Sequence, residues 1–467
     1  METHTRFVGA LTRREFLKVA GLAGGAVVLG ACTPAPVGAP QSAEQSAEAP
    51  AGENITISWW SPFTPGEINN AAIGGVVEGF EQEYPSIKVE YEVTGGPPGG
   101  GDFMEVLLAR IAAGNPPETA TIWTPPSQFG ARGSLTPVDD FFADAKWGKP
   151  ESFFTGPLKS CQWRGKTYGL PASAGAGSIY TNEDKFTEKG ISTKREDFPK
   201  TWDELKALSA EFVVWEGDEL KQAGFVPWAE SWLKPVWSGL NGGLLFDQEA
   251  EKYVIDSEQN VAWLDYWVQW LDEQYQGDVE KLNLYGNWAG VGPETAFNQG
   301  LSAMSQGGSW SPTLSDFTFG YEVVKFPVGP SGSTSVTGYW PNWWAIPNGA
   351  KSVKEDFLFC EYFCTKGWEI WYRYVLDTPA WKDFPSGVLT KSLVDLVGEE
   401  KAQDIHNFFA AYLEDTVLMW NSPIEDFASD TMDTTLDEVL HKTKTPAQAL
   451  QEAQGICQAK LEETLQS

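Results

Sequence analysis

The alternation of short β-rich runs and amphipathic segments in residues 55–123 constrains the fold of this chain most. Ile55–Trp59 is a β-rich run, and the segment after it, Asn69–Tyr84, places apolar side chains at helical spacing. Ile87–Val93 then alternates as a strand does, Met104–Ala113 returns to helical spacing, and Thr119–Trp123 is a third strand-like run. This β-α-β-α-β order predicts an α/β fold with a parallel sheet and right-handed crossovers.

Patterns of both kinds continue along the rest of the chain. A single core stops growing at about 250–300 residues, so a chain of 467 residues predicts at least two domains. Further helices are expected at Trp202–Phe212, Asn260–Gln274, Glu355–Trp371, Lys401–Met419 and Pro446–Leu465. Further strands are expected at Thr167–Leu170, Ser302–Ser305, Tyr321–Lys325 and Trp343–Ile346.

Residues 1–32 have the pattern of an export signal. Thr12–Lys18 reads TRREFLK, which matches the twin-arginine motif, and the apolar run Val19–Ala31 is shorter than the about 20 residues that span a bilayer. Leu29–Cys32 reads LGAC and fits a lipobox, in which the cysteine is acylated and becomes the mature N-terminus. We therefore expect export and a lipid anchor on Cys32; the alternative is a buried helix that contains both motifs by chance.

The segment after Cys32 has the composition of a linker. Residues 33–52 are rich in Pro, Ala and Ser and contain no aromatic residue, so they cannot bury enough apolar surface to fold. Such a disordered stalk would lift the globular body off the membrane while keeping it tethered there. The location predicted is therefore extracytoplasmic, on the outer face of the cell membrane.

The charge of the chain limits its partners. Its formal net charge is −31, which disfavours nucleic acids and anionic lipid surfaces and weakens the case for an anionic ligand. Beyond Cys32 the cysteines are Cys161, Cys360, Cys364 and Cys457, whose pairing the sequence leaves open. No metal-ligand spacing or enzyme motif is present, so neither cofactor nor metal is expected. Two distant carboxylates could still form a glycosidase pair, so a surface enzyme acting on polysaccharide stays open as an alternative.

The positions of the 22 tryptophans point to a ligand cleft. Trp60, Trp123, Trp310 and Trp340 follow predicted strands or lie among Gly, Pro and Ser residues. In open α/β sheets ligands bind at the carboxyl ends of strands, and a flat indole suits the apolar face of a pyranose ring. These tryptophans are therefore predicted to contact a ligand. Core packing is predicted instead for the tryptophans on helical segments, Trp263, Trp267, Trp270, Trp368 and Trp371.

Several motifs occur in an order that resembles a known family. Trp163–Pro171, Ile179–Asn182 and Pro199–Leu205 are followed by Ala296–Gly300, Ala303–Trp310 and Phe326-Pro327. From about residue 53 to the C-terminus, the chain resembles the sugar-binding branch of ABC-transporter extracellular solute-binding proteins, the maltose-binding-protein type. The resemblance implies a monomer of periplasmic-binding-protein type II architecture, with two α/β lobes, hinge segments and a ligand cleft between the lobes.

The resemblance also implies a division of the chain. Lobe 1 would be residues 53–172 plus 307–365, and lobe 2 would be residues 173–306 plus 366–467. The hinges would lie near Pro171–Ala174 and Gln306–Ser309, with a third crossing around residue 365.

Site residues follow where the motifs match. Trp123 stands where the family has a sugar-stacking aromatic residue, Trp310 matches a second aromatic position, and Gly175 stands where maltose binding uses an acidic residue. Ser127 and Gln128 replace a charged pair, so maltose itself is not the expected ligand. The full set of expected ligand contacts is Trp60, Ser61, Trp123, Ser127, Gln128, Ser173, Glu230, Trp232, Ser309, Trp310, Gly338, Tyr339, Trp340 and Arg373.

The function expected is capture of a carbohydrate by lobe closure and its delivery to the permease of an ABC transporter, without enzymatic activity. An alternative on the same fold is a binder of glycerol phosphate or another small polar solute. That alternative requires cationic groups in the cleft, for which Arg132, Arg164 and Arg373 are the candidates. The sequence leaves open which sugar binds and how long it is.

Overall fold

The computed structural model describes residues 54–63, 65–91, 103–313, 315, 317–416 and 419–466. The expected signal peptide, the lipid anchor on Cys32 and the linker 33–52 lie outside these residues. Within the described ranges, no helix combines the length and the apolar composition needed to cross a membrane.

The first of two main sheets has the strand order β2-β1-β3-β15-β6. Strands β1, β2 and β3 are parallel, and helices α2 and α3 connect them, as the sequence predicted. Strand β15 runs antiparallel between β3 and β6. The elements are β1 (Ile55–Trp60), α2 (Glu67–Glu83), β2 (Ile87–Tyr91), α3 (Phe103–Ala112), β3 (Thr119–Ile122), β6 (Leu170–Pro171) and β15 (Trp343–Ala345).

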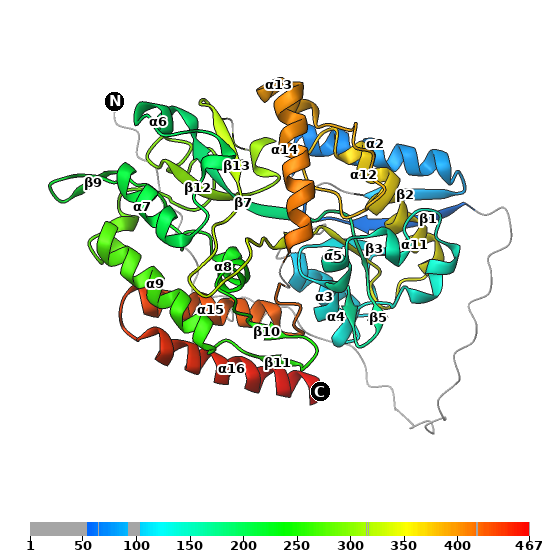
Figure 1. Ribbon diagram of the computed structural model, residues 1–467. Helices are drawn as coiled ribbons and strands as arrows, with labels where there is room; N and C mark the ends of the chain where they lie inside the picture. Colours follow the sequence, from blue (N-terminus) through cyan, green and yellow to red (C-terminus); the bar gives the residue numbers. More distant parts are fainter. Residues whose placement is uncertain are drawn as a thin grey trace, which may run out of the picture. The chain divides into compact units, whose positions relative to one another are not determined.

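The second sheet is built around β7 (Gly175–Asn182), all of whose residues are buried. Three strands pair with it antiparallel: β12 (Met304–Gly308), β13 (Tyr321–Val324) and β14 (Tyr339–Trp340). Helices α9 (Glu258–Gln274), α15 (Glu425–Leu440) and α16 (Pro446–Gln466) pack against one another in this half of the molecule (Figure 1).

The other helices and strands are shorter or lie outside the two main sheets. The helices are α4 (Pro126–Ala131), α5 (Thr155–Lys159), α6 (Glu183–Glu188), α7 (Trp202–Phe212), α8 (Lys234–Leu240), α10 (Val279–Asn283), α11 (Val353–Tyr362), α12 (Trp368–Trp371), α13 (Lys391–Val397) and α14 (Glu399–Tyr412). The strands are β4 (Gln162–Trp163), β5 (Lys166–Thr167), β8 (Val214–Glu216), β9 (Glu219–Gln222), β10 (Phe246–Asp247) and β11 (Lys252–Tyr253).

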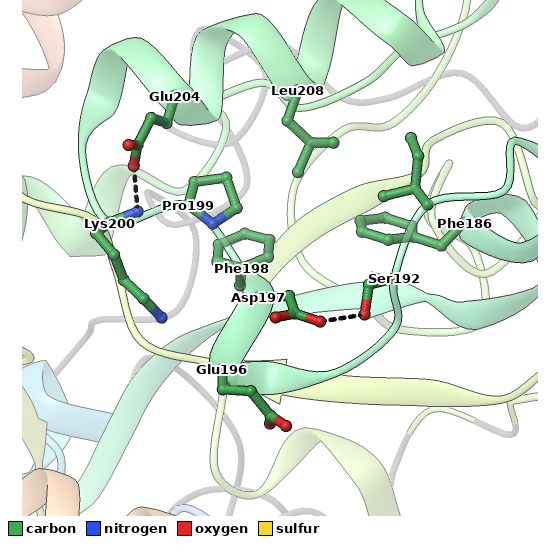
Figure 2. Close-up of a pocket in the computed structure, with 10 residues that line it drawn as sticks. Phe186, Ser192, Glu196, Asp197, Phe198, Pro199, Lys200, Glu204 and Leu208 are labelled. Carbon is green, nitrogen blue, oxygen red and sulfur yellow. Dashed lines mark hydrogen bonds between the residues drawn. The ribbon is translucent and has the colours of Figure 1, made fainter.

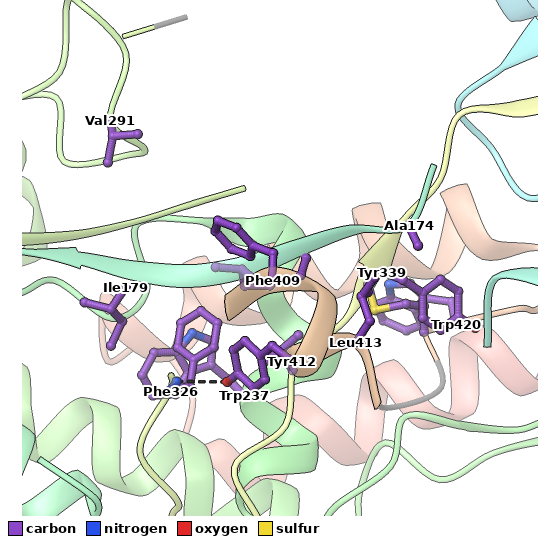
Figure 3. Packing of buried hydrophobic residues seen from close by; sticks show 14 of the residues in the cluster. Ala174, Ile179, Trp237, Val291, Phe326, Tyr339, Phe409, Tyr412, Leu413 and Trp420 are labelled. Carbon is purple, nitrogen blue, oxygen red and sulfur yellow. Dashed lines mark hydrogen bonds between the residues drawn. The ribbon is translucent and has the colours of Figure 1, made fainter. Parts of the chain in front are cut away.

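The core beside β7 joins segments that are far apart in sequence (Figure 3). Ile179 of β7, Trp237 of α8 and Phe326 are buried there together. The buried Tyr412 hydroxyl accepts a hydrogen bond from Phe326 N at 2.9 Å and donates one to Val336 O at 3.0 Å. The hydroxyl of Tyr412, at the end of helix α14, is thereby paired within the core and holds the helix to the segments that follow β13.

Two strand connections carry the chain from one sheet to the other, and a third segment lies beside them. The first, Ala172–Ala174, joins β6 to β7, and the second, Pro341-Asn342, joins β14 to β15. The third, Asp377–Ala380, is hydrogen-bonded to the first, with Ala174 N donating to Thr378 O at 2.6 Å and Ala380 N to Ala172 O at 3.0 Å. The sequence placed the second crossing at Gln306–Ser309. It falls later because β12, β13 and β14 all remain paired with β7.

Some expected elements differ from those observed. The helix expected at Glu355–Trp371 is interrupted by a π-helical turn, Phe363–Gly367. Gly367 lies so close to Val76 and to the Tyr362 carbonyl that a side chain at this position would clash with them. The strand expected at Thr167–Leu170 is two short strands in different sheets, and the helix expected to reach Met419 ends at Tyr412. Helix α15 was missed because its Thr and Asp residues are weak helix formers; burial of Met432 and similar side chains stabilises it.

The four cysteines of the described region, Cys161, Cys360, Cys364 and Cys457, are all buried and unpaired. The pairing that the sequence left open is therefore absent. The thiols act as small apolar side chains, and burial raises the pKa of Cys161, Cys360 and Cys364 well above its usual value.

Candidate ligand-binding site

Aromatic side chains from both main sheets line one cavity of about 480 Å³. Phe63 and Trp123 lie beyond the carboxyl ends of β1 and β3, whereas Trp310 follows β12 of the second sheet. The cavity therefore receives residues from the strand ends where open α/β sheets bind ligands. Among the described residues its lining is Phe63, Asn69, Trp123, Trp232, Trp310, Trp340, Pro341, Asn342, Trp343, Trp371, Val375 and Asp377.

Three of the tryptophans form a cluster on one wall. The Trp232 ring lies 5.7 Å from the Trp310 ring and 4.1 Å from the Trp340 ring, which is perpendicular to it. Trp310 fits against two glycines: a methyl group built on Gly175 would come 2.5 Å from its ring, and one on Gly308 would clash more closely. The two glycines thus create the space that Trp310 occupies. At position 175 an acidic side chain would displace the indole.

Trp123 lines the cavity from the end of β3 and is its most exposed tryptophan, at 57%. Its indole Nε1 donates a hydrogen bond to Asn342 Oδ1 at 2.8 Å. The Phe63 ring lies 6.5 Å away in an edge-on arrangement, and Trp371 packs on Phe63 at 4.6 Å. Trp371 was assigned to the core by its helical spacing. It is buried, and it also contributes to the cavity wall.

Asp377 is the charged residue in the cavity wall, and among the described residues no Lys, Arg or His lines it. Asp377 Oδ2 accepts from Asn342 Nδ2 at 2.8 Å. Burial raises the pKa of Asp377 to about 8, although the neighbouring Ser173 and Asn342 side chains oppose that rise. The sequence missed both Asn342 and Asp377. Asn342 stands inside the Tyr339–Trp344 motif, which could have drawn attention to it, whereas no local pattern marks Asp377.

Glu230 lies behind the cavity wall. Its Oε2 accepts a hydrogen bond from Trp232 Nε1, so it fixes the orientation of an indole that does line the cavity. Burial raises the pKa of Glu230 to about 7, against the effect of that hydrogen bond. In this position the Glu230 carboxyl supports Trp232.

Of the predicted contacts, Trp123, Trp232, Trp310 and Trp340 are brought together in the cavity wall. Trp60 is not: Arg110 lies 5.4 Å over its ring, on the other side of β1 from the buried Trp59. Strand alternation explains the difference, because neighbouring residues of a strand point to opposite faces.

The remaining predicted contacts also lie outside the wall. Ser61 Oγ accepts from Phe63 N at 3.2 Å, Ser173 Oγ accepts from Asn342 N at 2.8 Å, and Gln128 Nε2 donates to Asp426 Oδ2 at 2.8 Å. Tyr339 is buried, with its hydroxyl accepting from Asn421 Nδ2 at 3.0 Å. The others are the buried Ser127, Ser309 and Gly338, and the exposed Arg373.

The cationic groups considered for a phosphate ligand are engaged elsewhere or exposed outside the cavity. Arg132 Nη2 donates to Pro423 O at 2.8 Å, and Arg164 forms a two-pronged ion pair with Glu251 at 3.0 and 2.9 Å. Among the described residues, no cluster of acidic, histidine or cysteine side chains is arranged to hold a metal ion. The cavity therefore offers aromatic faces, amides and one carboxyl group.

A second hollow, of about 470 Å³, lies beside the start of α7 (Figure 2). Several of its polar groups are already paired: Ser192 Oγ donates to Asp197 Oδ2, and Lys200 N to Glu204 Oε2, both at 2.7 Å. Thr201 and Glu204 form a capping box at the start of α7. The Pro199–Leu205 motif thus serves helix formation in this structure.

The fold and the cavity define a two-lobed α/β protein with a tryptophan-lined cavity to which both main sheets contribute. The chain belongs to the bacterial extracellular solute-binding protein family, whose model matches residues 65–369.

Relatives agree with this assignment over part of the chain. A binding protein of Brucella abortus is 32% identical over 144 residues, which is 31% of this chain and 32% of that protein. An uncharacterized ABC transporter extracellular-binding protein of Pyrococcus horikoshii is 27% identical over 162 residues, or 34% of each chain. The match thus spans about a third of the length of these relatives.

Solved structures match over nearly the whole fold. CpMnBP1 with mannotriose bound has a TM-score of 0.70 at 19% identity, covering 86% of this chain and 99% of that one. An ABC substrate-binding protein from Listeria monocytogenes in complex with cycloalternan has a TM-score of 0.69 at 19% identity, covering 88% and 99%. The two-lobed type II architecture predicted from the sequence is confirmed by these similarities.

Proposed function

We propose that this protein captures a neutral carbohydrate in the tryptophan-lined cavity and delivers it to an ABC permease. The observation that carries the proposal is the cavity wall itself, in which Trp123, Trp310 and Trp340 surround a space with no cationic side chain among the described residues. Indole faces suit the apolar faces of sugar rings, and the amide of Asn342 and the carboxyl of Asp377 suit hydroxyl groups. Structural neighbours with mannotriose or cycloalternan bound support the ligand class.

Binding would act through closure of the two lobes. A ligand that contacts both lobes has a higher affinity for the closed form and shifts the population toward it. We propose that the permease recognises this closed form. The hinges would be the segments Ala172–Ala174 and Pro341-Asn342, where the chain passes between the sheets, together with Asp377–Ala380, which is hydrogen-bonded to the first of them. Lobe 1 would then take up 54–172 and a stretch that starts near residue 341, and lobe 2 would hold 173–340 and the C-terminal helices.

The cellular setting is part of the same proposal. Membership of an extracellular solute-binding family implies action outside the cytoplasm. The motifs of residues 12–32 support twin-arginine export and a lipid on Cys32, with residues 33–52 as the tether. We further propose that the protein is a monomer and converts no substrate. Fractionation of cells that express Cys32→Ser tests the anchor: the variant should leave the membrane fraction, and retention there would contradict lipidation.

Titration calorimetry of the purified full-length chain tests the ligand class. The panel is mannotriose, maltotriose and cycloalternan, with glycerol 3-phosphate as the anionic test ligand. Saturable binding of one or more carbohydrates, at about micromolar affinity or better, is expected. Heat from glycerol 3-phosphate alone would contradict the proposal and favour the polar-solute alternative. No heat from any carbohydrate would also contradict it.

A further inference from the structure

One residue from each of the two crossing segments and one from the segment beside them meet at a single point. Ser173 belongs to the first segment, Asn342 to the second and Asp377 to the third. Asn342 N donates to Ser173 Oγ at 2.8 Å, and Asn342 Nδ2 donates to Asp377 Oδ2 at 2.8 Å and to Ser173 Oγ at 3.2 Å. The backbone follows the same pattern, since Ala172 N donates to Asn342 O at 2.8 Å. These contacts tie the three segments to one another.

The same asparagine also holds a cavity tryptophan. Asn342 Oδ1 accepts the indole N–H of Trp123 at 2.8 Å. A neutral amide offers two N–H donors and one carbonyl oxygen, and here each group is engaged. The reversed amide would set its N–H groups against the indole N–H and its oxygen against the Asp377 carboxyl, so the contacts on both sides fix its orientation.

We propose that Asn342 is a positioning residue that couples the Trp123 platform to the crossing segments, so that ligand stacking and hinge geometry depend on each other. The inference rests on the proposed function for its ligand but not for its geometry. Trp123 is 57% exposed and would otherwise sample several rotamers. Its link to Asn342 removes that freedom before the ligand arrives, which lowers the entropic cost of binding.

The burial of Asp377, which accepts a hydrogen bond from Asn342, supports the positioning role of Asn342. Asp377 is 5% exposed, and its backbone carbonyl accepts from Trp368 Nε1 at 3.2 Å, so the carboxyl that receives Asn342 Nδ2 is fixed from behind. A movement of Asp377–Ala380 relative to Pro341-Asn342 would reach Trp123 through two hydrogen bonds, Asp377–Asn342 and Asn342–Trp123. Trp123 is therefore placed to respond to a displacement of these segments relative to one another.

The first experiment needs no ligand. Protein labelled with 5-fluorotryptophan is examined by ¹⁹F NMR, and the signal lost in Trp123→Phe identifies Trp123. Asn342→Ala should shift or broaden that signal. Asn348→Ala should not, because Asn348 is an exposed asparagine that donates instead to Gly133 O at 3.0 Å. An unmoved Trp123 signal in Asn342→Ala would overturn the proposal. If that variant does not fold, Asn342→Asp, which sets a carboxyl against Asp377, replaces it with the same expectation.

The second experiment is a double-mutant cycle with mannotriose. Trp123→Phe keeps an aromatic face and removes the N–H donor, so it should weaken binding about two- to ten-fold, as loss of one hydrogen bond does. Asn342→Ala should weaken binding at least as much, and the double variant should bind no more weakly than Asn342→Ala alone. A merely structural role predicts effects that multiply, and that result would overturn the coupling. If wild-type protein does not bind mannotriose, the ligand proposal loses support and the NMR result decides the inference alone.

Discussion

The tryptophans of helix α9 and those of the cavity differ in their burial and in their hydrogen bonds. Trp263, Trp267 and Trp270 are at most 1% exposed, and their indole N–H groups have no hydrogen-bond partner among the described residues. In the cavity, Trp123 and Trp232 each donate their N–H to a fixed acceptor, Asn342 and Glu230. Packing holds the three indoles of α9, whereas Trp123 and Trp232, which lie beside open space, are also oriented by a polar contact.

The largest effect that tests this comparison is expected from Trp267→Ala. Trp267 packs against Trp228, Trp237 and Trp263, with ring centroids 6.3, 5.4 and 5.0 Å away. Its removal leaves a cavity, so the free energy of unfolding should fall by about 3–5 kcal/mol, measured by urea denaturation. The control is Trp123→Ala, which should change it by less than about 1 kcal/mol. Equal losses in both variants would contradict the distinction.

The next effect is expected from Trp310→Ala, which removes one indole of the cavity cluster. An aromatic side chain at the centre of a binding site contributes about 2 kcal/mol or more, so the carbohydrate affinity should fall about 30-fold or more. Thermal unfolding should change little, because Trp310 is only partly buried. Calorimetry measures the affinity. Unchanged affinity with the fold intact would remove Trp310 from the site.

A smaller loss of affinity is expected when the space for Trp310 is filled. Gly308→Ala places a methyl group against the Trp310 indole, so the ring must move and the affinity should fall by about ten-fold. Gly292→Ala is the matched control, since its nearest neighbour, Thr295, is 3.9 Å from the added atom. If Gly308→Ala binds like the control, the glycine does not set the position of Trp310.

The smallest expected effect is a pH dependence of the stability, and it concerns buried carboxyl groups in the core and in the cavity wall. Burial, with the neighbouring Glu118, raises the pKa of Asp356 to about 10, and burial raises the pKa of Asp377 to about 8. A carboxyl with a raised pKa keeps a proton that the unfolded chain loses above about pH 4, so stability is lost as pH rises from there toward the folded-state pKa. We expect the melting temperature to fall by a few degrees between pH 5 and pH 8.

The variant Asp356→Asn distinguishes the contributions of Asp356 and Asp377, because Asp356 is buried away from the cavity lining. The variant should flatten the dependence of the melting temperature on pH and leave the carbohydrate affinity unchanged. A melting temperature that rises from pH 5 to pH 8 in the wild type would contradict the sign of the effect.

Local patterns in the sequence were sufficient for much of the fold. The strands and helices of residues 55–122 follow from period and composition, and their parallel pairing is confirmed. The same reasoning brought Trp123, Trp310 and Trp340 to one site because each lies at or next to a strand end. It failed for Trp60, which strand alternation directs toward Arg110.

What the sequence could not provide depends on contacts between distant residues. Ser173, Asn342 and Asp377 meet only because three segments that are distant in sequence lie side by side, and no spacing along the chain records that contact. The late return to the first sheet at Pro341-Asn342 has the same origin, since only strand pairing shows that β13 and β14 stay with β7. Helix α15 depends on its packing against α9 and α16.

The position of β15 determines when the first sheet can form during synthesis. This strand lies between β3 and β6, yet it is encoded at residues 343–345, far downstream of both neighbours. Until the ribosome has added those residues, the edges of β3 and β6 that pair with it have no partner. Such open edges are prone to aggregate, and pairing of distant segments is slow. A chaperone that occupies the nascent chain during this interval would therefore protect the half of the molecule that is made first.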